Sequence, residues 1–173
     1  MIALAGTLAY WARCTVSIAL IMSALWKLRH QAEFSRVLGA VFRQRFRLLR
    51  LALSVVVPVA EIAVAGVILM PGAAGVLGSA LAGALVFTLS ATMLRHDLTA
   101  GCGCWSGPHP SRAAVLARNG LLIALVAGSV AGQPALSWRL VLPGIAIGGI
   151  FAFLIMEIPV IGQYFADAQG VAP

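Results

Sequence analysis

Charged residues are scarce in this sequence. Lys, Arg, Asp and Glu make up only 10% of its 173 residues, whereas 61% are hydrophobic, against about 45–50% in soluble globular domains. A soluble domain of this length could not bury so much apolar surface, so the composition excludes a soluble fold. The sequence also lacks a nucleotide-binding loop, a catalytic triad and any fingerprint of a soluble cofactor site, so it gives no support to the enzyme classes that such motifs define.

Long apolar runs are present instead. Five of them approach the roughly 20 residues that cross the hydrocarbon core of a bilayer, at residues 4–26, 51–70, 73–94, 113–131 and 140–161. We predict an all-α, polytopic transmembrane helical bundle that forms one domain over residues 1–173, because no break in composition divides the chain. The first run lacks a basic n-region and a small-x-small cleavage site, so we expect it to remain in the mature protein.

A basic segment separates the first two runs. It predicts an amphipathic helix at about residues 33–50, with apolar positions at helical spacing on one face and arginines on another. The apolar positions are Phe34, Val37, Leu38, Val41 and Phe42, and the arginines are Arg36, Arg43, Arg47 and Arg50. Such a helix suits the surface of a bilayer with anionic headgroups. This interpretation is favoured over binding to nucleic acid or to a protein partner.

Lysine and arginine crowd one side of the predicted membrane. The crowded side holds Lys27, Arg29, Arg36, Arg43, Arg45, Arg47, Arg50, Arg95 and Arg112, while the other side has only Arg139. By the positive-inside rule the crowded side is cytoplasmic and the N-terminus lies outside. The segment between the third and fourth runs, which contains two cysteines, is then also cytoplasmic.

Two charged residues lie inside the predicted helices. Arg13 and Glu61 are each about 14 Å into their helices, and either charge alone would be expensive in the membrane. We therefore predict a buried ion pair between them, with either a structural role or a role in handling protons or substrate. Pro58, one turn before Glu61, should kink the second helix. Cys14 is expected to be a small core residue.

Cysteine is rare, and two of the three cysteines lie one glycine apart. A disulfide between Cys102 and Cys104 would close a very small ring, so it should be strained and readily reduced. Nearby cations favour the nucleophilic thiolate, namely Lys27, Arg95, Arg112 and Arg118. A redox pair is the preferred interpretation. The alternatives are a copper site with His96 and His109, or two idle thiols.

Four short motifs together resemble the MauE group of redox-associated membrane proteins, which are relatives of DoxX. They are "SALWKL" at 23–28, "PVAE" at 58–61, "CGCWSG" at 102–107 and "RNGLLIAL" at 118–125. The matching positions are Arg13, Lys27, Pro58, Glu61, Cys102, Cys104, Arg118 and Asn119. The resemblance implies a four-helix core, to which this chain adds a fifth, C-terminal helix. Ser106 interrupts the aromatic-glycine pair that follows the cysteines in the family.

The resemblance also implies an accessory role. MauE is linked to methylamine utilisation, where it is thought to help a thioredoxin-like partner to form or process disulfides as methylamine dehydrogenase matures. We therefore expect a thiol-disulfide oxidoreductase or its accessory subunit in the bacterial cytoplasmic (inner) membrane, with Cys102 and Cys104 exchanging and with Arg118 and Lys27 favouring thiolate. No cofactor is predicted, although quinone and copper stay open, and small residues on the helices would also suit a homo-oligomer.

Two other functions compete with this one. The first is a carrier of a small solute, protons or copper that works through Glu61 and Arg13, and the second is an inert membrane scaffold for a redox enzyme. The topology also conflicts with disulfide chemistry, which belongs outside the cytoplasm. Either the cysteines exchange with a cytoplasmic thiol system, or the basic helix lies outside, or the cysteines dip into the bundle and are reached from the other side.

Overall fold

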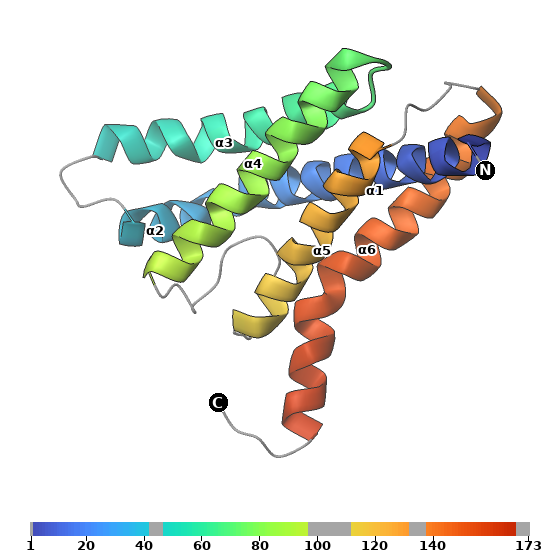
Figure 1. The fold of residues 1–173 in the computed structure, drawn as a ribbon. Helices are drawn as coiled ribbons and strands as arrows, with labels where there is room; N and C mark the ends of the chain where they lie inside the picture. Colours follow the sequence, from blue (N-terminus) through green and yellow to red (C-terminus); the bar gives the residue numbers. More distant parts are fainter. Residues whose placement is uncertain (1, 42–46, 97–111, 132–137, 169–173) are drawn as a thin grey trace.

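The computed structural model describes residues 2–41, 47–96, 112–131 and 138–168. Six helices make up this part of the chain (Figure 1): α1 (Ile2–Arg29), α2 (Gln31–Val41), α3 (Arg47–Ile68), α4 (Ala73–His96), α5 (Arg112–Ala131) and α6 (Trp138–Ala168). No strand occurs within the described ranges. The predicted all-α fold class is confirmed.

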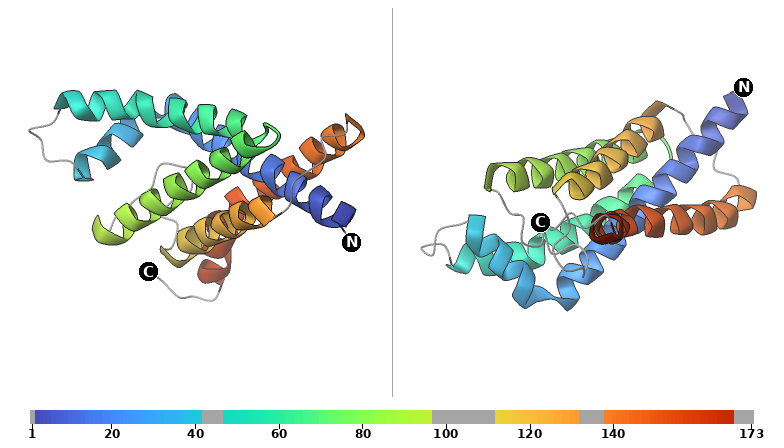
Figure 2. Two further views of the ribbon diagram at one scale, coloured as in Figure 1. Left: turned by 45° about the horizontal axis from the view of Figure 1, so that its top comes forward. Right: turned by 90° about the horizontal axis from the view of Figure 1, so that it is seen from below.

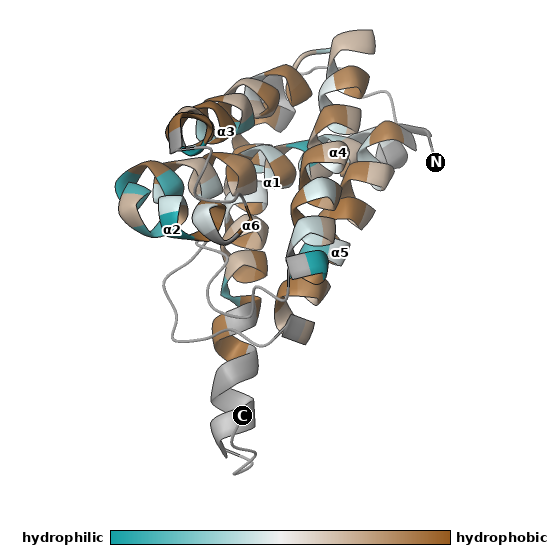
Figure 3. Ribbon diagram, turned by 90° about the vertical axis from the view of Figure 1, so that its left-hand side faces the viewer, coloured by the Kyte–Doolittle hydropathy of each residue, from teal (hydrophilic) through white to brown (hydrophobic). Residues whose placement is uncertain are grey.

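Five of the helices are long and apolar enough to cross a membrane, namely α1, α3, α4, α5 and α6. Many of their large apolar side chains point outward, among them Val55, Val59, Leu142, Ile150 and Phe153. Figure 3 shows hydrophobic residues along α3, α4 and α6, whereas hydrophilic residues gather on α2. An apolar exterior is what lipid requires, because lipid tails are as apolar as leucine. The molecule is therefore a polytopic helical membrane protein.

Helix α1 is the centre of the bundle. It packs against α3, α5 and α6 and is the most buried of the five spans. Helix α4 packs between α3 and α5. The two views in Figure 2 show α1 running between α3 and α6. The core of α1, α3, α4 and α5 is thus joined by α6, which lies against α1 and α5.

Glycines allow α6 to approach α1 closely. A Cβ atom at Gly148 would lie 2.8 Å from Cys14 Cβ and 3.0 Å from the backbone nitrogen of Thr15. One at Gly144 would lie 2.7 Å from the Tyr10 ring. Small residues permit such close contact between membrane helices. From the sequence alone, these two glycines could pack equally well in a dimer or within the bundle. In the structure they pack against α1 within the bundle.

The basic segment differs from the single amphipathic helix predicted over residues 33–50. Helix α2 ends at Val41, and Arg47 already belongs to the first turn of α3. The apolar sequence from Leu48 onward continues the transmembrane pattern, so the second span begins earlier than predicted. Within α2, Phe34 is buried and Arg36 is exposed. The side chain of Arg50 reaches back from α3 toward Gly39 of α2.

The helix ends fall into two groups. The C-terminal end of α1, helix α2, the C-terminal end of α4 and the N-terminal end of α5 lie at one end of the bundle (Figure 1). The N-terminus and the α3–α4 turn lie at the other end. That turn needs Gly72, whose φ of 69° is left-handed. Residues 97–111 are therefore joined to the bundle at the same end as α2.

Candidate functional site

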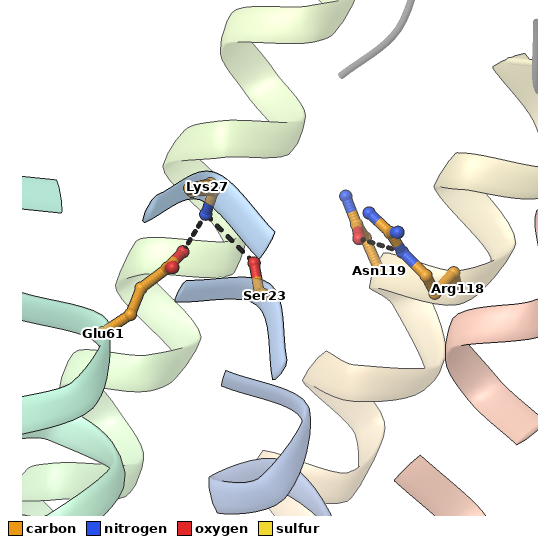
Figure 4. Close-up of polar contacts among 5 residues, drawn as sticks. All are labelled: Ser23, Lys27, Glu61, Arg118 and Asn119. Atoms are coloured by element: carbon orange, nitrogen blue, oxygen red, sulfur yellow. Dashed lines mark hydrogen bonds and ion pairs between the residues drawn. The ribbon is translucent and has the colours of Figure 1, made fainter. Parts of the chain in front are cut away.

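A buried ion pair joins α1 to α3. Lys27 Nζ donates to Glu61 Oε1 and also to Ser23 Oγ, at 3.0 Å, as Figure 4 shows. Lys27 and Glu61 are each only 1% exposed. The ammonium also lies 5.6 Å from the centre of the Phe34 ring, a distance at which a cation is attracted to an aromatic face. Helices α1, α2 and α3 are thus connected through Lys27.

The predicted ion pair between Arg13 and Glu61 is wrong. The register of the two helices explains why, because Ser17 Oγ donates to the backbone carbonyl of Ala65 at 2.9 Å. Glu61 lies one turn before Ala65 on an antiparallel helix, so it faces the part of α1 beyond Ser17, toward Lys27. Arg13 lies one turn in the opposite direction.

Arg13 instead binds the C-terminal end of α5. Its Nε and Nη2 atoms donate to the carbonyl oxygen of Ser129 at 3.3 and 3.2 Å. Ser129 belongs to the last turn of α5, where carbonyls have no donor within the helix and the helix dipole is negative. A helix end therefore takes the place of the expected carboxylate.

A second buried cation lies on α5. Arg118 is 6% exposed, and its Nε donates to Asn119 Oδ1 at 3.3 Å. Asn119 Nδ2 in turn donates to Ser90 Oγ of α4 at 2.9 Å, and Ser90 donates to the Val86 carbonyl at 2.7 Å. In the part of the chain that the structure describes, no carboxylate lies within salt-bridge distance of Arg118.

Four of these polar residues line one small central cavity. Its volume is about 40 Å³, and its polar lining comes from Ser23, Glu61, Arg118 and Asn119. The remainder is apolar and is contributed by Val16, Ala19, Leu20, Leu85, Val86, Leu89, Leu122 and Met156. In Figure 4 the Lys27–Glu61 pair and the Arg118–Asn119 pair lie on either side of Ser23. Glu61 and Arg118, which are far apart in the sequence, thus line the same cavity, and Lys27 is bonded to Glu61.

The predicted cysteine site lies outside the described residues. This applies to Cys102, Cys104 and His109, and to the side chain of His96, so the redox pair and the copper alternative stay predictions. Within the described ranges no group of three or more His, Cys, Asp or Glu side chains is arranged to hold a metal. Cys14 is buried between α1 and α6, as expected of a small core residue.

Sequence reasoning missed two of the polar residues. Ser23 lies four residues before Lys27, and side chains at this spacing share one face of a helix, so the contact could have been found. Ser90 carries no such signal, because only the packing of α4 against α5 brings it to Asn119.

Comparison with known proteins bears on the whole site. No match was found among curated proteins or solved structures. The family described as "Methylamine utilisation protein MauE" matches residues 5–132, a range that contains every lining residue of the cavity except Met156. Because this match covers well over half of the sequence, the chain belongs to the MauE family.

Proposed function

We propose that the protein is a thiol-disulfide accessory protein of the bacterial cytoplasmic membrane. In this proposal Cys102 and Cys104 exchange with a thioredoxin-like partner and assist the maturation of a methylamine dehydrogenase-type enzyme. One observation carries the proposal. A buried cation, Arg118, lies without a carboxylate partner among the described residues, near the end of the bundle to which residues 97–111 are joined.

Arg118 is suited to stabilising a thiolate. It is six residues from the first residue of α5, which is about 9 Å along the helix, and arginine extends a long apolar stem toward the polar side. A neighbouring cation lowers the free energy of the thiolate relative to the thiol. Lys27 is less suited to this role than predicted, because its charge is compensated by Glu61.

The proposed exchange needs both cysteines. A thiolate of the partner attacks one sulfur of the Cys102–Cys104 disulfide and forms a mixed disulfide, and the partner's second thiolate then displaces it. The partner loses two electrons and becomes a disulfide, while Cys102 and Cys104 gain two electrons and take up two protons. Strain in the small ring favours this direction.

A redox titration of the purified protein tests the proposal. We expect one two-electron couple in glutathione buffers, read out by alkylation of free thiols and mass spectrometry. Cys102→Ser and Cys104→Ser should each abolish it and stop oxidation of a thioredoxin-like partner, whereas Cys14→Ser should not. The proposal is rejected if the wild type has no couple, or if Cys102→Ser leaves partner oxidation unchanged.

The cavity also favours one alternative, a carrier that works through Glu61. A buried cavity with charged side chains on its wall is a place inside a membrane bundle where a small solute or proton could be handled. Arg13 does not share this site, because it binds Ser129. The alternative predicts solute-dependent behaviour that Glu61→Gln abolishes and Cys102→Ser leaves intact, which is opposite to the result expected for thiol exchange.

A further inference from the structure

The charges around the central cavity do not cancel. Lys27, Glu61 and Arg118 are all more than nine-tenths buried, and Lys27 and Glu61 compensate each other. Arg118 therefore leaves one excess positive charge among these three residues. A buried charge without a counter-charge is strongly destabilising, because it has lost its hydration without gaining an equivalent partner.

The donors of Arg118 are held in a fixed direction. A guanidinium has five N–H donors, and Asn119 accepts only the one on Nε. Asn119 is itself fixed by Ser90. Figure 4 shows the guanidinium and the amide side by side on α5, facing the space between α5 and α1. Within the described ranges no acceptor is bonded to the terminal nitrogens of Arg118, so these nitrogens are left to bind a ligand in the cavity.

Ser23 supplies a second donor on the opposite wall. Its Oγ accepts a hydrogen bond from Lys27, so its own hydroxyl proton remains to be donated. Ser23 lines the same cavity as Arg118 and is itself buried. The cavity therefore presents donors from both α1 and α5 around one positive charge that no carboxylate of the described residues compensates.

We propose that the Arg118 end of this cavity is a binding site for one small monovalent anion. The volume of about 40 Å³ exceeds the roughly 10–15 Å³ that a cavity needs to hold one water, so it admits a small anion such as a halide or a single sulfur. Because the excess is one positive charge, it favours an anion that carries a single negative charge. Glu61 also lines the cavity, and its carboxylate repels an anion, so we expect the anion to lie at the Arg118 end.

Two sources supply this chemistry. One is a halide from solution, and the other is the thiolate of Cys102 or Cys104. A halide needs neither cysteine, so the anion site goes beyond the proposed thiol exchange. If the anion site and the proposed thiol exchange both exist, halide and thiolate compete for Arg118.

Halide dependence of thermal unfolding tests the site. The full-length protein in detergent is unfolded in sodium bromide or sodium gluconate at constant ionic strength. We expect bromide to raise the unfolding midpoint of the Cys102→Ser/Cys104→Ser variant in a saturable way, as ligand linkage requires. If thiolate does not compete with bromide, the midpoint of the wild type should rise by the same amount. If the midpoint of the wild type rises only at higher bromide concentrations than that of the double variant, or does not rise at all while that of the double variant does, thiolate is identified as a competing occupant.

Arg118→Gln should lose the bromide response. Its midpoint in gluconate should equal or exceed that of the wild type, because the uncompensated charge has been removed. Arg95→Gln is the matched control, since Arg95 is exposed at the end of α4, and it should keep the response. An equal bromide response with and without Arg118, or no response in either the wild type or the double variant, overturns the proposal.

A measurement without substitution at Arg118 covers the case in which Arg118→Gln does not fold. Chloride NMR lines should broaden in the presence of the folded Cys102→Ser/Cys104→Ser protein, and bromide should reverse the broadening. Absence of broadening overturns the anion site. The thiol-disulfide function is judged separately by the redox titration, which contains no halide variable, so the two proposals fail independently.

Discussion

Lys27 and Glu61 each lower the free-energy cost of burying the other. Both are 1% exposed and bonded to each other. Removing one partner from a buried ion pair leaves an uncompensated charge, whereas replacing both by neutral residues of similar size is much less harmful. The pair is therefore expected to behave as one unit when it is mutated.

We predict that Lys27→Met and Glu61→Gln each lower the free energy of unfolding by about 3–5 kcal/mol, the usual cost of breaking a buried pair. The double variant should be more stable than either single variant. Unfolding in mixed micelles with increasing SDS measures all four proteins of the double-mutant cycle. Additive losses would show that the two side chains do not depend on each other.

The sequence predicted which charged residues are buried but not how they pair. Arg13 and Glu61 stand out because charges within apolar runs are rare. Their partners depend on helix register, and the contact between Ser17 and Ala65 that sets it involves two residues with no distinctive pattern. Arg13 could not be assigned to Ser129 either, since a backbone carbonyl leaves no mark in the sequence.

At the scale of elements, α6 depends on glycine to reach α1. The family match ends at residue 132, before α6 begins, yet α6 contributes Met156 to the cavity. Its close approach places Gly148 against the backbone of Thr15. The position of α6 is thus coupled to the same helix that carries Lys27.

We predict that Gly148→Ala destabilises the protein by about 1–3 kcal/mol, a typical cost of overpacking. The added Cβ would lie 2.8 Å from Cys14 Cβ and 3.0 Å from a backbone nitrogen, so the helices must separate. Thermal unfolding in detergent measures the effect.

The neighbouring glycine is the control for this prediction. At Gly149 the nearest atom to a new Cβ is Ile18 Cδ1 at 3.9 Å, which is ordinary contact. Gly149→Ala should be neutral or stabilising by up to about 1 kcal/mol through helix propensity. Similar losses of stability in Gly148→Ala and Gly149→Ala would mean that close packing does not explain the effect of Gly148→Ala.

Helices were easier to predict than the boundaries between them. Length and hydropathy sufficed for the five spans, because a membrane imposes both. The boundary between α2 and α3 was not evident, since Arg47 and Arg50 continue the basic pattern of the preceding segment while Leu48, Leu49 and Leu51 begin an apolar one. Only packing shows that these arginines belong to the start of a span.

At the scale of the whole molecule, exposed cations lie at one end of the bundle. Arg29, Arg36 and Arg95 are exposed on elements that meet there, beside the helix ends that flank residues 97–111 (Figure 1). The positive-inside rule predicts that this end is cytoplasmic.

Labelling of intact cells with a membrane-impermeant maleimide tests this orientation. In the Cys102→Ser/Cys104→Ser background, Ala73→Cys near the α3–α4 turn should be labelled, whereas Gln31→Cys at the start of α2 should be labelled only after permeabilisation. Both positions are exposed. The reverse pattern would place the cysteine segment on the outer side, where disulfides persist.

The central position of α1 also bears on how the protein enters the membrane. α1 is the least hydrophobic of the five spans and α3 the most hydrophobic, and α1 carries both Arg13 and Lys27. Insertion of α1 alone would bring two charges into lipid, so we expect it to leave the translocon with α3 as a hairpin, in which Glu61 neutralises Lys27. Arg13 finds its acceptor only when Ser129 has been synthesised. Helix α1 is therefore synthesised before the five described helices that follow it, but it completes its contacts only after α5 has been made.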